Sequence, residues 1–318
     1  MLGSHRSGFD GERMHLAVLS ILLLVLVGAC EDQVAAPSRM EEPFSMYGII
    51  NPRLFFQTVG IAPIQPLLHD YPASLDAVVT STDLQTGEII TWQDSVVTSD
   101  EGQLDHVFYA EFLPEFGRTY RVEAVRSDGA ATSAIAHVPA LVEVSAETDS
   151  EQRLQILITG ERFNLLSIEV IYQLRLHAFA DPDPCSTEPF THTVDYTGTE
   201  SEIEHGFGFR VRLPLDRNDI ESAYVRRPSE YGVALMRMDV RLVVGDEDWD
   251  PPGGDFDPNT LSDPDVMTNT TNGFGLVAGG YNHDAVAFPP VSAIAATRFY
   301  DYVVRPPADC YDYCGCGQ

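Results

Sequence analysis

The chain has 318 residues, of which 19 are basic and 48 acidic, and its net charge at pH 7 is −29. A surface this acidic repels phosphate groups, so we exclude nucleic acid and anionic phospholipid headgroups as direct partners. Every basic residue is an arginine, and five cysteines are spread over the chain.

A short apolar segment near the N-terminus ends in two small residues and Cys30. The run 16–29 is too short to cross a bilayer as a helix, which takes about 20 residues, and is typical of a cleaved signal sequence. Small residues before a cysteine are typical of bacterial lipoproteins, in which the thiol receives the lipid. We therefore predict a signal peptide over 1–29 and lipidation at Cys30. An ordinary secretory signal is the alternative.

Residues 30–43 follow as a Pro-containing tether. The acidic pair Glu31 and Asp32, directly behind the cysteine, resembles a signal for export of lipoproteins to the cell surface. A processed lipoprotein carries two or three acyl chains, which anchor it without a membrane-spanning helix. We expect the mature protein to be anchored in the outer membrane and displayed at the cell surface.

Alternating apolar and polar residues predict an all-β chain that begins with an immunoglobulin- or fibronectin-like β-sandwich over 44–139. Gly87 and Gly129 mark two hairpin turns. Tyr120 begins a strand as in the tyrosine corner of such modules, where the hydroxyl bonds back to the backbone. The expected strands are 45–51, 54–61, 75–82, 88–92, 106–112, 119–126 and 130–138.

The segment 140–305 predicts a second β-sandwich-like domain with longer strands, and a cysteine-containing tail follows over 306–318. Alternation is clearest over 168–178, 207–213 and 234–244. In the last of these, Ala234, Met236, Met238, Val240, Leu242 and Val244 are expected to face the core.

Two segments of the second half depart from the strand pattern. Residues 215–226 have a short helical pattern. The glycine-rich segment 269–281 lacks the spacing of a dinucleotide-binding loop. We therefore interpret its glycines as positions of tight bends and close backbone approach.

Four features together resemble the DUF4249 lipoproteins of Bacteroidetes and relatives. They are the cysteine-terminated signal, the Gly-Arg-Thr-Tyr corner at 117–120, the strand Ile-Tyr-Gln-Leu-Arg-Leu at 171–176 and Asn-Gly-Phe-Gly at 272–275. The resemblance covers nearly the whole mature chain. It implies a surface or periplasmic lipoprotein, often associated with a TonB-dependent outer-membrane receptor, and brings no enzymatic activity. The cysteine tail departs from it.

Four cysteines remain besides Cys30, and an even number of thiols in an oxidising compartment favours two disulfides. Cys314 and Cys316 are too close to favour pairing with each other, so we expect Cys185 to be joined to the tail. A zinc site made by the same thiols is the alternative. The four are Cys185, Cys310, Cys314 and Cys316.

The loop 246–265 concentrates carboxylates around a Pro-Pro-Gly-Gly kink. Clustered Asp oxygens suit calcium, although the spacing is not that of an EF-hand. A solvated loop is the alternative, and no other cofactor is expected. The calcium ligands to test are Asp246, Asp248, Asp250, Asp255 and Asp257.

Five arginines fall where the alternation of the second domain places side chains outward. They predict a local basic face that binds a carboxylated or sulfated ligand, because the guanidinium fork matches such anions. Pairing across strands with carboxylates such as Glu169 and Asp239 is the alternative. The five are Arg175, Arg210, Arg212, Arg237 and Arg241.

The chain contains no nucleophile elbow, no zinc-protease helix motif and no Walker loop. His177, on a polar strand face, and His283, beside Asp284, are candidate acid/base groups that we interpret as surface histidines. We therefore expect a non-enzymatic binding or accessory subunit. A hydrolase that uses carboxylates of the acidic loops, and a structural or adhesion component of the envelope, are the alternatives.

Overall fold

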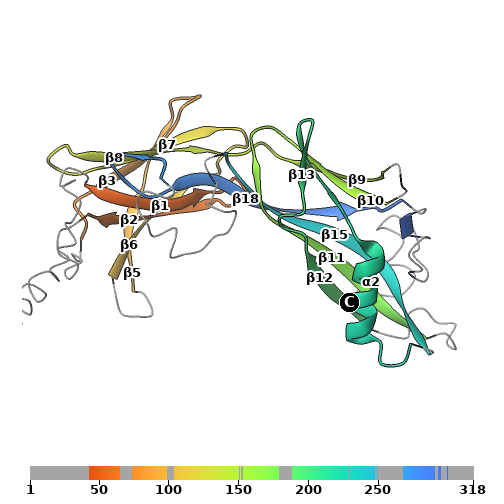
Figure 1. Cartoon of the computed structure of the whole chain (residues 1–318). Helices are drawn as coiled ribbons and strands as arrows, with labels where there is room; N and C mark the ends of the chain where they lie inside the picture. Colours follow the sequence, from red (N-terminus) through yellow and green to blue (C-terminus); the bar gives the residue numbers. More distant parts are fainter. Residues whose placement is uncertain are drawn as a thin grey trace, which may run out of the picture. The chain divides into compact units, whose positions relative to one another are not determined.

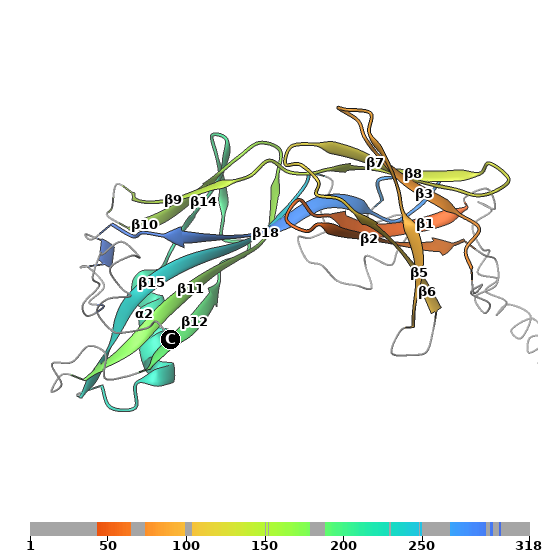
Figure 2. The same cartoon turned by 180° about the vertical axis from the view of Figure 1, so that it is seen from behind.

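The computed structural model describes residues 43–64, 74–98, 104–149, 151, 153–178, 188–228, 230–247, 249, 268–290, 293, 294 and 299. All of them belong to one compact unit that begins at Glu41. Strands make up most of this part of the chain, and the predicted all-β class is confirmed (Figures 1 and 2). The predicted signal peptide, nearly all of the tether and the cysteine tail lie outside the described residues.

The first half folds as a β-sandwich of two sheets around one hydrophobic core. One sheet has the order β1-β2-β6-β5 and the other the order β8-β7-β3-β4. This is the immunoglobulin arrangement A-B-E-D against G-F-C with one further strand beside C, so the expected module is confirmed. The strands are β1 (Phe44–Ile50), β2 (Phe56–Pro63), β3 (Val78–Asp83), β4 (Ile89–Thr91), β5 (Gln93–Thr98), β6 (Leu104–Glu111), β7 (Thr119–Val125) and β8 (Ala131–His137).

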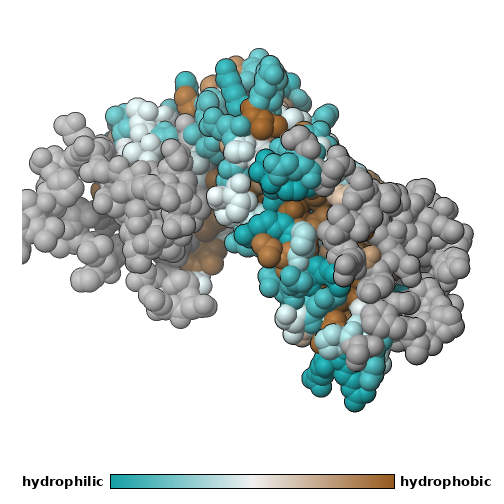
Figure 3. All heavy atoms as spheres, turned by 45° about the vertical axis from the view of Figure 1, so that its right-hand side comes forward, coloured by the Kyte–Doolittle hydropathy of each residue, from teal (hydrophilic) through white to brown (hydrophobic). Residues whose placement is uncertain are grey.

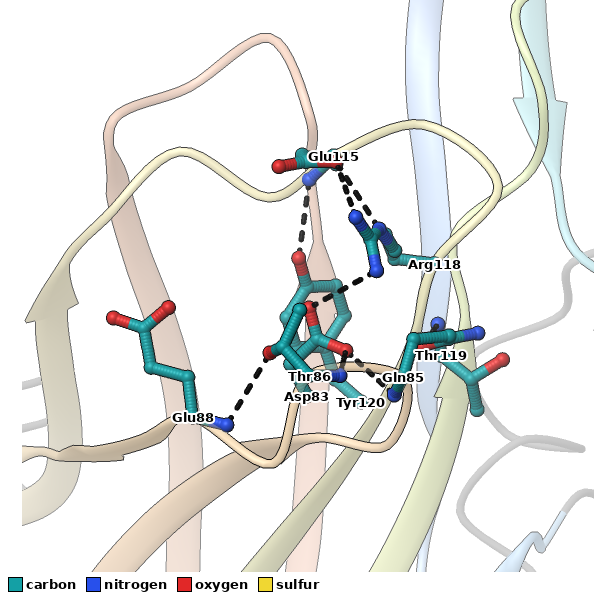
Figure 4. Close-up of polar contacts among 8 residues, drawn as sticks. All are labelled: Asp83, Gln85, Thr86, Glu88, Glu115, Arg118, Thr119 and Tyr120. Carbon is teal, nitrogen blue, oxygen red and sulfur yellow. Dashed lines mark hydrogen bonds and ion pairs between the residues drawn. The ribbon is translucent and has the colours of Figure 1, made fainter.

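The expected tyrosine corner is present at the start of β7 (Figure 4). The Tyr120 side chain is buried, and its hydroxyl accepts the backbone N–H of Glu115 at 3.1 Å. Arg118 donates to the Glu115 carboxylate at 2.9 Å and lies 3.9 Å from Asp83. The corner therefore ties the loop before β7 to the end of β3.

Asp83 closes the hairpin between β3 and β4. Its carboxylate accepts the backbone N–H groups of Gln85 at 2.7 Å and Thr86 at 3.1 Å. Burial alone would raise the pKa of Asp83, but these hydrogen bonds and Arg118 outweigh it and lower the pKa. The turn itself needs a positive φ, and Gly87 supplies it at 78°.

The second half contains another two-layered arrangement, with the sheet order β12-β11-β15-β18 against β13-β14-β10-β9. Its core is separate from the first one and contains the fully buried Tyr172 and Tyr196. The strands are β9 (Glu143–Thr148), β10 (Leu154–Thr159), β11 (Asn164–Ala178), β12 (Pro189–Asp195), β13 (Ser201–Ile203), β14 (Gly206–Arg210), β15 (Tyr231–Gly245) and β18 (Val277–Ala287).

One nine-stranded sheet runs through both halves, because β18 pairs with β15 on one side and with β1 on the other. The glycine-rich segment leads into this connection and is named the clasp here (269–279). Within it, β16 (Thr270–Thr271) pairs with β8, and β17 (Gly273–Phe274) pairs with β1. The clasp therefore joins both sheets of the first sandwich before the chain enters the second one.

Two clasp glycines are required by close backbone approach. A Cβ at Gly279 would lie 2.1 Å from the carbonyl oxygen of His137, and one at Gly275 would lie 2.1 Å from that of Met46. Gly275 also has a φ of 105°. Any side chain would displace the neighbouring strand at these positions, so the structural interpretation of the glycines is confirmed.

The expected pattern of β15 is wrong in its first part. Val233 and Leu235 are buried there, instead of Ala234 and Met236. The pairing with β11 shifts where Gln173 lies opposite Arg237 and Leu174 lies opposite Leu235, which leaves Met236 as an extra residue. A β-bulge of this kind reverses the faces of all residues on one side of it.

The predicted helix is present as α2 (Leu213–Tyr224) and covers part of the second core. Its buried Asp216 accepts hydrogen bonds from the hydroxyl groups of Tyr172 and Tyr196 through one carboxylate oxygen. Burial is the main reason that the pKa of each tyrosine lies well above its usual value. Both hydroxyls therefore keep their protons, and this buried network fixes the helix on the sheet.

Candidate functional site

Outward side chains of the first sandwich form an exposed apolar surface on the nine-stranded sheet. Tyr47 and Ile49 of β1 are 46% and 43% exposed, and Phe56 of β2 is 51% exposed. Tyr109 of β6 stacks on Phe56 with 5.1 Å between ring centroids. We call these four residues the apolar face. The turn before β2 adds exposed Leu54 and Phe55.

The core does not require apolar residues at these positions. In β1, Phe44, Met46 and Ile50 alternate with the outward residues and fill the interior. The strand register places Tyr109 opposite Thr58, diagonal to Phe56 on the same side of the sheet. Clustered aromatic and aliphatic groups that serve no core mark interaction surfaces.

The same side of the sheet has a different chemistry in the second half. Arg241 of β15 lies 3.0 Å from Asp284 of β18 and 3.7 Å from Glu169 of β11. Arg237 donates to Asp239 at 2.6 Å. We call these five residues the charged face. Asp284 is the main reason that the pKa of Arg241 is raised above its usual value.

The structure does not bring the five predicted arginines into one groove. Arg210 lies on β14 in the other sheet and contacts Asp149 at 3.2 Å. Arg212 precedes α2, with its guanidinium carbon 5.6 Å from the centre of the Tyr196 ring. Arg237 and Arg241 share a face, and both have carboxylate partners. This geometry favours the pairing interpretation, and an anion site at the five positions stays a prediction.

The expectation that Arg175 points into solvent is wrong, because this residue is only 5% exposed. Arg175 lies between Pro189 of β12 and Ala234 of β15, next to the bulge in β15. Alternation along a strand assigns a side of the sheet, and it does not say whether that side is covered. At Arg175 the outward side of the sheet is covered, so the side chain is buried.

Asp246 is fully buried at the end of β15. Its Oδ2 accepts the backbone N–H of Gly279 at 2.7 Å and that of His137 at 3.2 Å. One carboxylate thus joins the clasp, the last strand of the first sandwich and the second sandwich. From the sequence alone Asp246 groups with the loop that follows it, and only its position directly after Gly245, at the end of a strand, sets it apart.

The other four aspartates of the calcium prediction, Asp248, Asp250, Asp255 and Asp257, lie outside the described residues. Within the described ranges, no three His, Cys, Asp or Glu side chains are grouped so that they could hold a metal ion. Asp246 already uses one oxygen for two N–H groups, as described above. The calcium site therefore stays a prediction that rests on the loop.

Cys30, the four predicted disulfide cysteines and the side chain of His177 also lie outside the described part. His283 is described, and Arg53 donates to its Nδ1 at 2.7 Å. Arg53 also lies 5.5 Å from the centre of the Tyr281 ring. Burial, followed by the nearby Arg53 charge, lowers the pKa of His283. The pairing with Arg53 gives His283 a structural role that the sequence did not indicate.

One face of the molecule is drawn in Figure 3 and is largely hydrophilic. On the side drawn in Figure 3, teal residues predominate outside the grey regions, with smaller brown groups among them. No helix in the described ranges has the length and apolar character needed to cross a membrane.

Comparisons with known proteins give little further information. No family model and no curated protein matches the chain. Among solved structures, the chain is similar to the C-terminal globular domain of an oligosaccharyltransferase from Pyrococcus abyssi, with 10% identity and a TM-score of 0.19. The match covers 65% of this chain and 43% of that one.

Proposed function

We propose that this chain is a lipid-anchored outer-membrane protein that acts as a non-enzymatic binding or accessory subunit. We further propose that its apolar face docks a membrane partner, such as a TonB-dependent receptor. The supporting observation is the apolar face itself: two stacked aromatic rings and two further apolar side chains point outward from a sheet whose core is filled from the other side. The sequence of the signal segment and the family resemblance support the anchored location.

The chemistry of the two faces suggests how the surface is used. Tyr and Phe are enriched in the cores of protein interfaces, where they bury much area with few rotatable bonds. The arginines of the charged face already have carboxylate partners, so they suit the solvated rim of an interface. We therefore assign binding energy to the apolar face and orientation to the charged face.

A pair of matched substitutions tests the docking surface. Phe56 and Phe288 are both phenylalanines, 51% and 54% exposed, and only Phe56 belongs to the apolar face. Full-length protein is isolated from its native membrane in mild detergent, and the proteins that co-purify are quantified by mass spectrometry. We expect Phe56→Gln to lose a stoichiometric outer-membrane partner that Phe288→Gln retains. Equal recovery with both variants contradicts the proposed surface.

The anchor is tested separately at Cys30. Cells grown with labelled palmitate should label the wild-type protein and leave Cys30→Ser unlabelled, since the thiol is the acceptor. The wild-type protein should fractionate with the outer membrane, and the variant should lose that association. Equal labelling of both proteins would exclude Cys30 as the lipid site without affecting the test of the apolar face.

A further inference from the structure

A hollow of about 480 Å³ lies on the outer side of the other sheet of the first sandwich. Its described lining comes from alternate residues of β7 and β8 and from the clasp strand β16. The two sheets of a sandwich present their outer sides in opposite directions, so the hollow and the apolar face are separate surfaces. Its volume lies within the range of small-molecule sites, roughly 300–1,000 Å³.

Several polar side chains that line the hollow are available to bind a ligand. Among the described residues, the side chains of Arg121, Glu123, Ser133 and Thr271 have no hydrogen-bond or ion-pair partner. Most strand arginines differ in this respect, as Arg237 and Arg241 show. In a chain with 48 acidic residues, an arginine without a carboxylate partner is available for an anion from outside.

The register of the strands arranges these groups around a small apolar floor. Arg121 lies opposite Ile135, and Ser133 lies opposite Glu123 on one side and Thr271 on the other. Ile135 is 37% exposed within the hollow. The hollow thus combines one cation, one carboxylate, two hydroxyl groups and an aliphatic surface.

The residues that line the hollow are held in place by hydrogen bonds that do not use the four side chains available to a ligand. The Asn269 amide donates to the carbonyl oxygens of Ile135 at 3.0 Å and Val277 at 2.9 Å, and its Oδ1 accepts the Val277 N–H at 3.1 Å. The His137 ring contacts the Thr119 hydroxyl at 3.0 Å through Nδ1. A frame fixed before binding lowers the entropy lost when a ligand is ordered.

We propose that this hollow binds an acidic monosaccharide, a ligand that carries one carboxylate and several hydroxyl groups. The Arg121 guanidinium pairs with the sugar carboxylate in the two-point geometry that arginine favours. Glu123, Ser133 and Thr271 exchange hydrogen bonds with the sugar hydroxyls. Ile135 packs against the C–H surface of the ring. This site does not depend on the proposed docking surface.

The test is calorimetric titration of sodium glucuronate into the full-length lipidated protein in detergent micelles. We expect saturable binding with a ratio of one ligand per chain. Arg121→Gln should weaken binding at least about tenfold, since it removes a charge-assisted contact. Arg126→Gln is the matched control, because Arg126 follows the same strand and pairs with Asp128 at 2.7 Å; it should bind glucuronate as the wild-type protein does.

Two further ligands define the chemical class. Glucose lacks the carboxylate and glycine lacks the hydroxyl groups, so each should bind at least about tenfold more weakly than glucuronate. Equal affinity for glucose would overturn the assignment of an acidic ligand, and tighter binding of glycine would overturn that of a sugar. Absence of saturable glucuronate binding, or full retention of it in Arg121→Gln with an unchanged melting temperature, overturns the site.

Discussion

One side of the nine-stranded sheet is apolar over β1, β2 and β6 and charged over β11, β15 and β18. In the charged half, the exposed Arg237 and Arg241 face outward and each has a carboxylate neighbour, as solubility favours. In the apolar half, Tyr47, Ile49 and Phe56 face outward although the core gains nothing from them. A departure from the pattern that stability favours points to function.

The apolar and the charged half form one continuous sheet, and Gly279 lies where β18 connects them. Gly279→Ala places a Cβ 2.1 Å from the His137 carbonyl oxygen, so we expect a loss of at least about 3 kcal/mol in the free energy of unfolding. Urea denaturation measures it. Gly60→Ala is the control, because its nearest contact would be 3.6 Å, and should change stability by less than about 1 kcal/mol. Equal effects would mean that the clasp does not hold the halves together.

The Asp246 carboxylate should have the next largest effect. Asp246→Ala leaves the buried N–H group of Gly279 and the partly buried one of His137 without their acceptor, which should destabilise the fold by about 2–4 kcal/mol. The control is Asp284→Ala, because the Asp284 side chain is 65% exposed and should contribute less than about 1 kcal/mol. Chemical denaturation of both variants measures the two losses in the free energy of unfolding. If the Asp246 variant is as stable as the Asp284 variant, Asp246 does not hold the clasp and β8 to the second sandwich.

The charged face should respond weakly and in a salt-dependent way. Arg241→Gln removes two ion pairs of a side chain that is 50% exposed, so we expect a loss of up to about 1 kcal/mol at low salt. At 1 M salt the difference from wild type should disappear, because the Debye length falls to about 3 Å. A larger, salt-independent loss would show that the charged face is part of the core structure.

The smallest expected effect is a pH dependence at His283, which pairs with Arg53 of the turn between β1 and β2. Because its folded-state pKa is lowered, the unfolded chain takes up the proton more readily. Stability should therefore decrease as the pH falls through the unfolded value of about 6.5 towards the folded-state pKa. His283→Gln should remove part of this decrease in the melting temperature, whereas His205→Gln, at a side chain that is 83% exposed, should not. Identical pH profiles would contradict the burial argument.

Much of the fold could be predicted because alternation and turn chemistry are local. The seven expected strands of the first sandwich, the hairpin at Gly87 and the corner at Tyr120 all follow from short segments. The strand β5 was missed because it is a largely exposed edge strand with little alternation. The bulge at Met236 was missed because an extra residue in one strand is visible only when its partner strand is known.

The sites were less predictable, since they depend on what covers each side chain. The sequence placed Arg175 and Arg241 in the same class, although one is buried and the other is half exposed. The apolar face was missed because Phe56 and Tyr109 are far apart in the chain and read as ordinary strand residues. The hollow at Arg121 could not be predicted because it forms only where β16 pairs with β8, and these segments lie more than 130 residues apart in the chain.

Site-specific photo-crosslinking in native membranes tests the central claim most directly. A photoreactive amino acid replaces Phe56 or Tyr109 on the apolar face, and Glu169 on the charged face or Phe288 elsewhere as controls. The account predicts that Phe56 and Tyr109 positions crosslink to the same membrane protein, while the Glu169 and Phe288 positions give no such product. Crosslinks of equal yield from all four positions, or none from the apolar face, would contradict it.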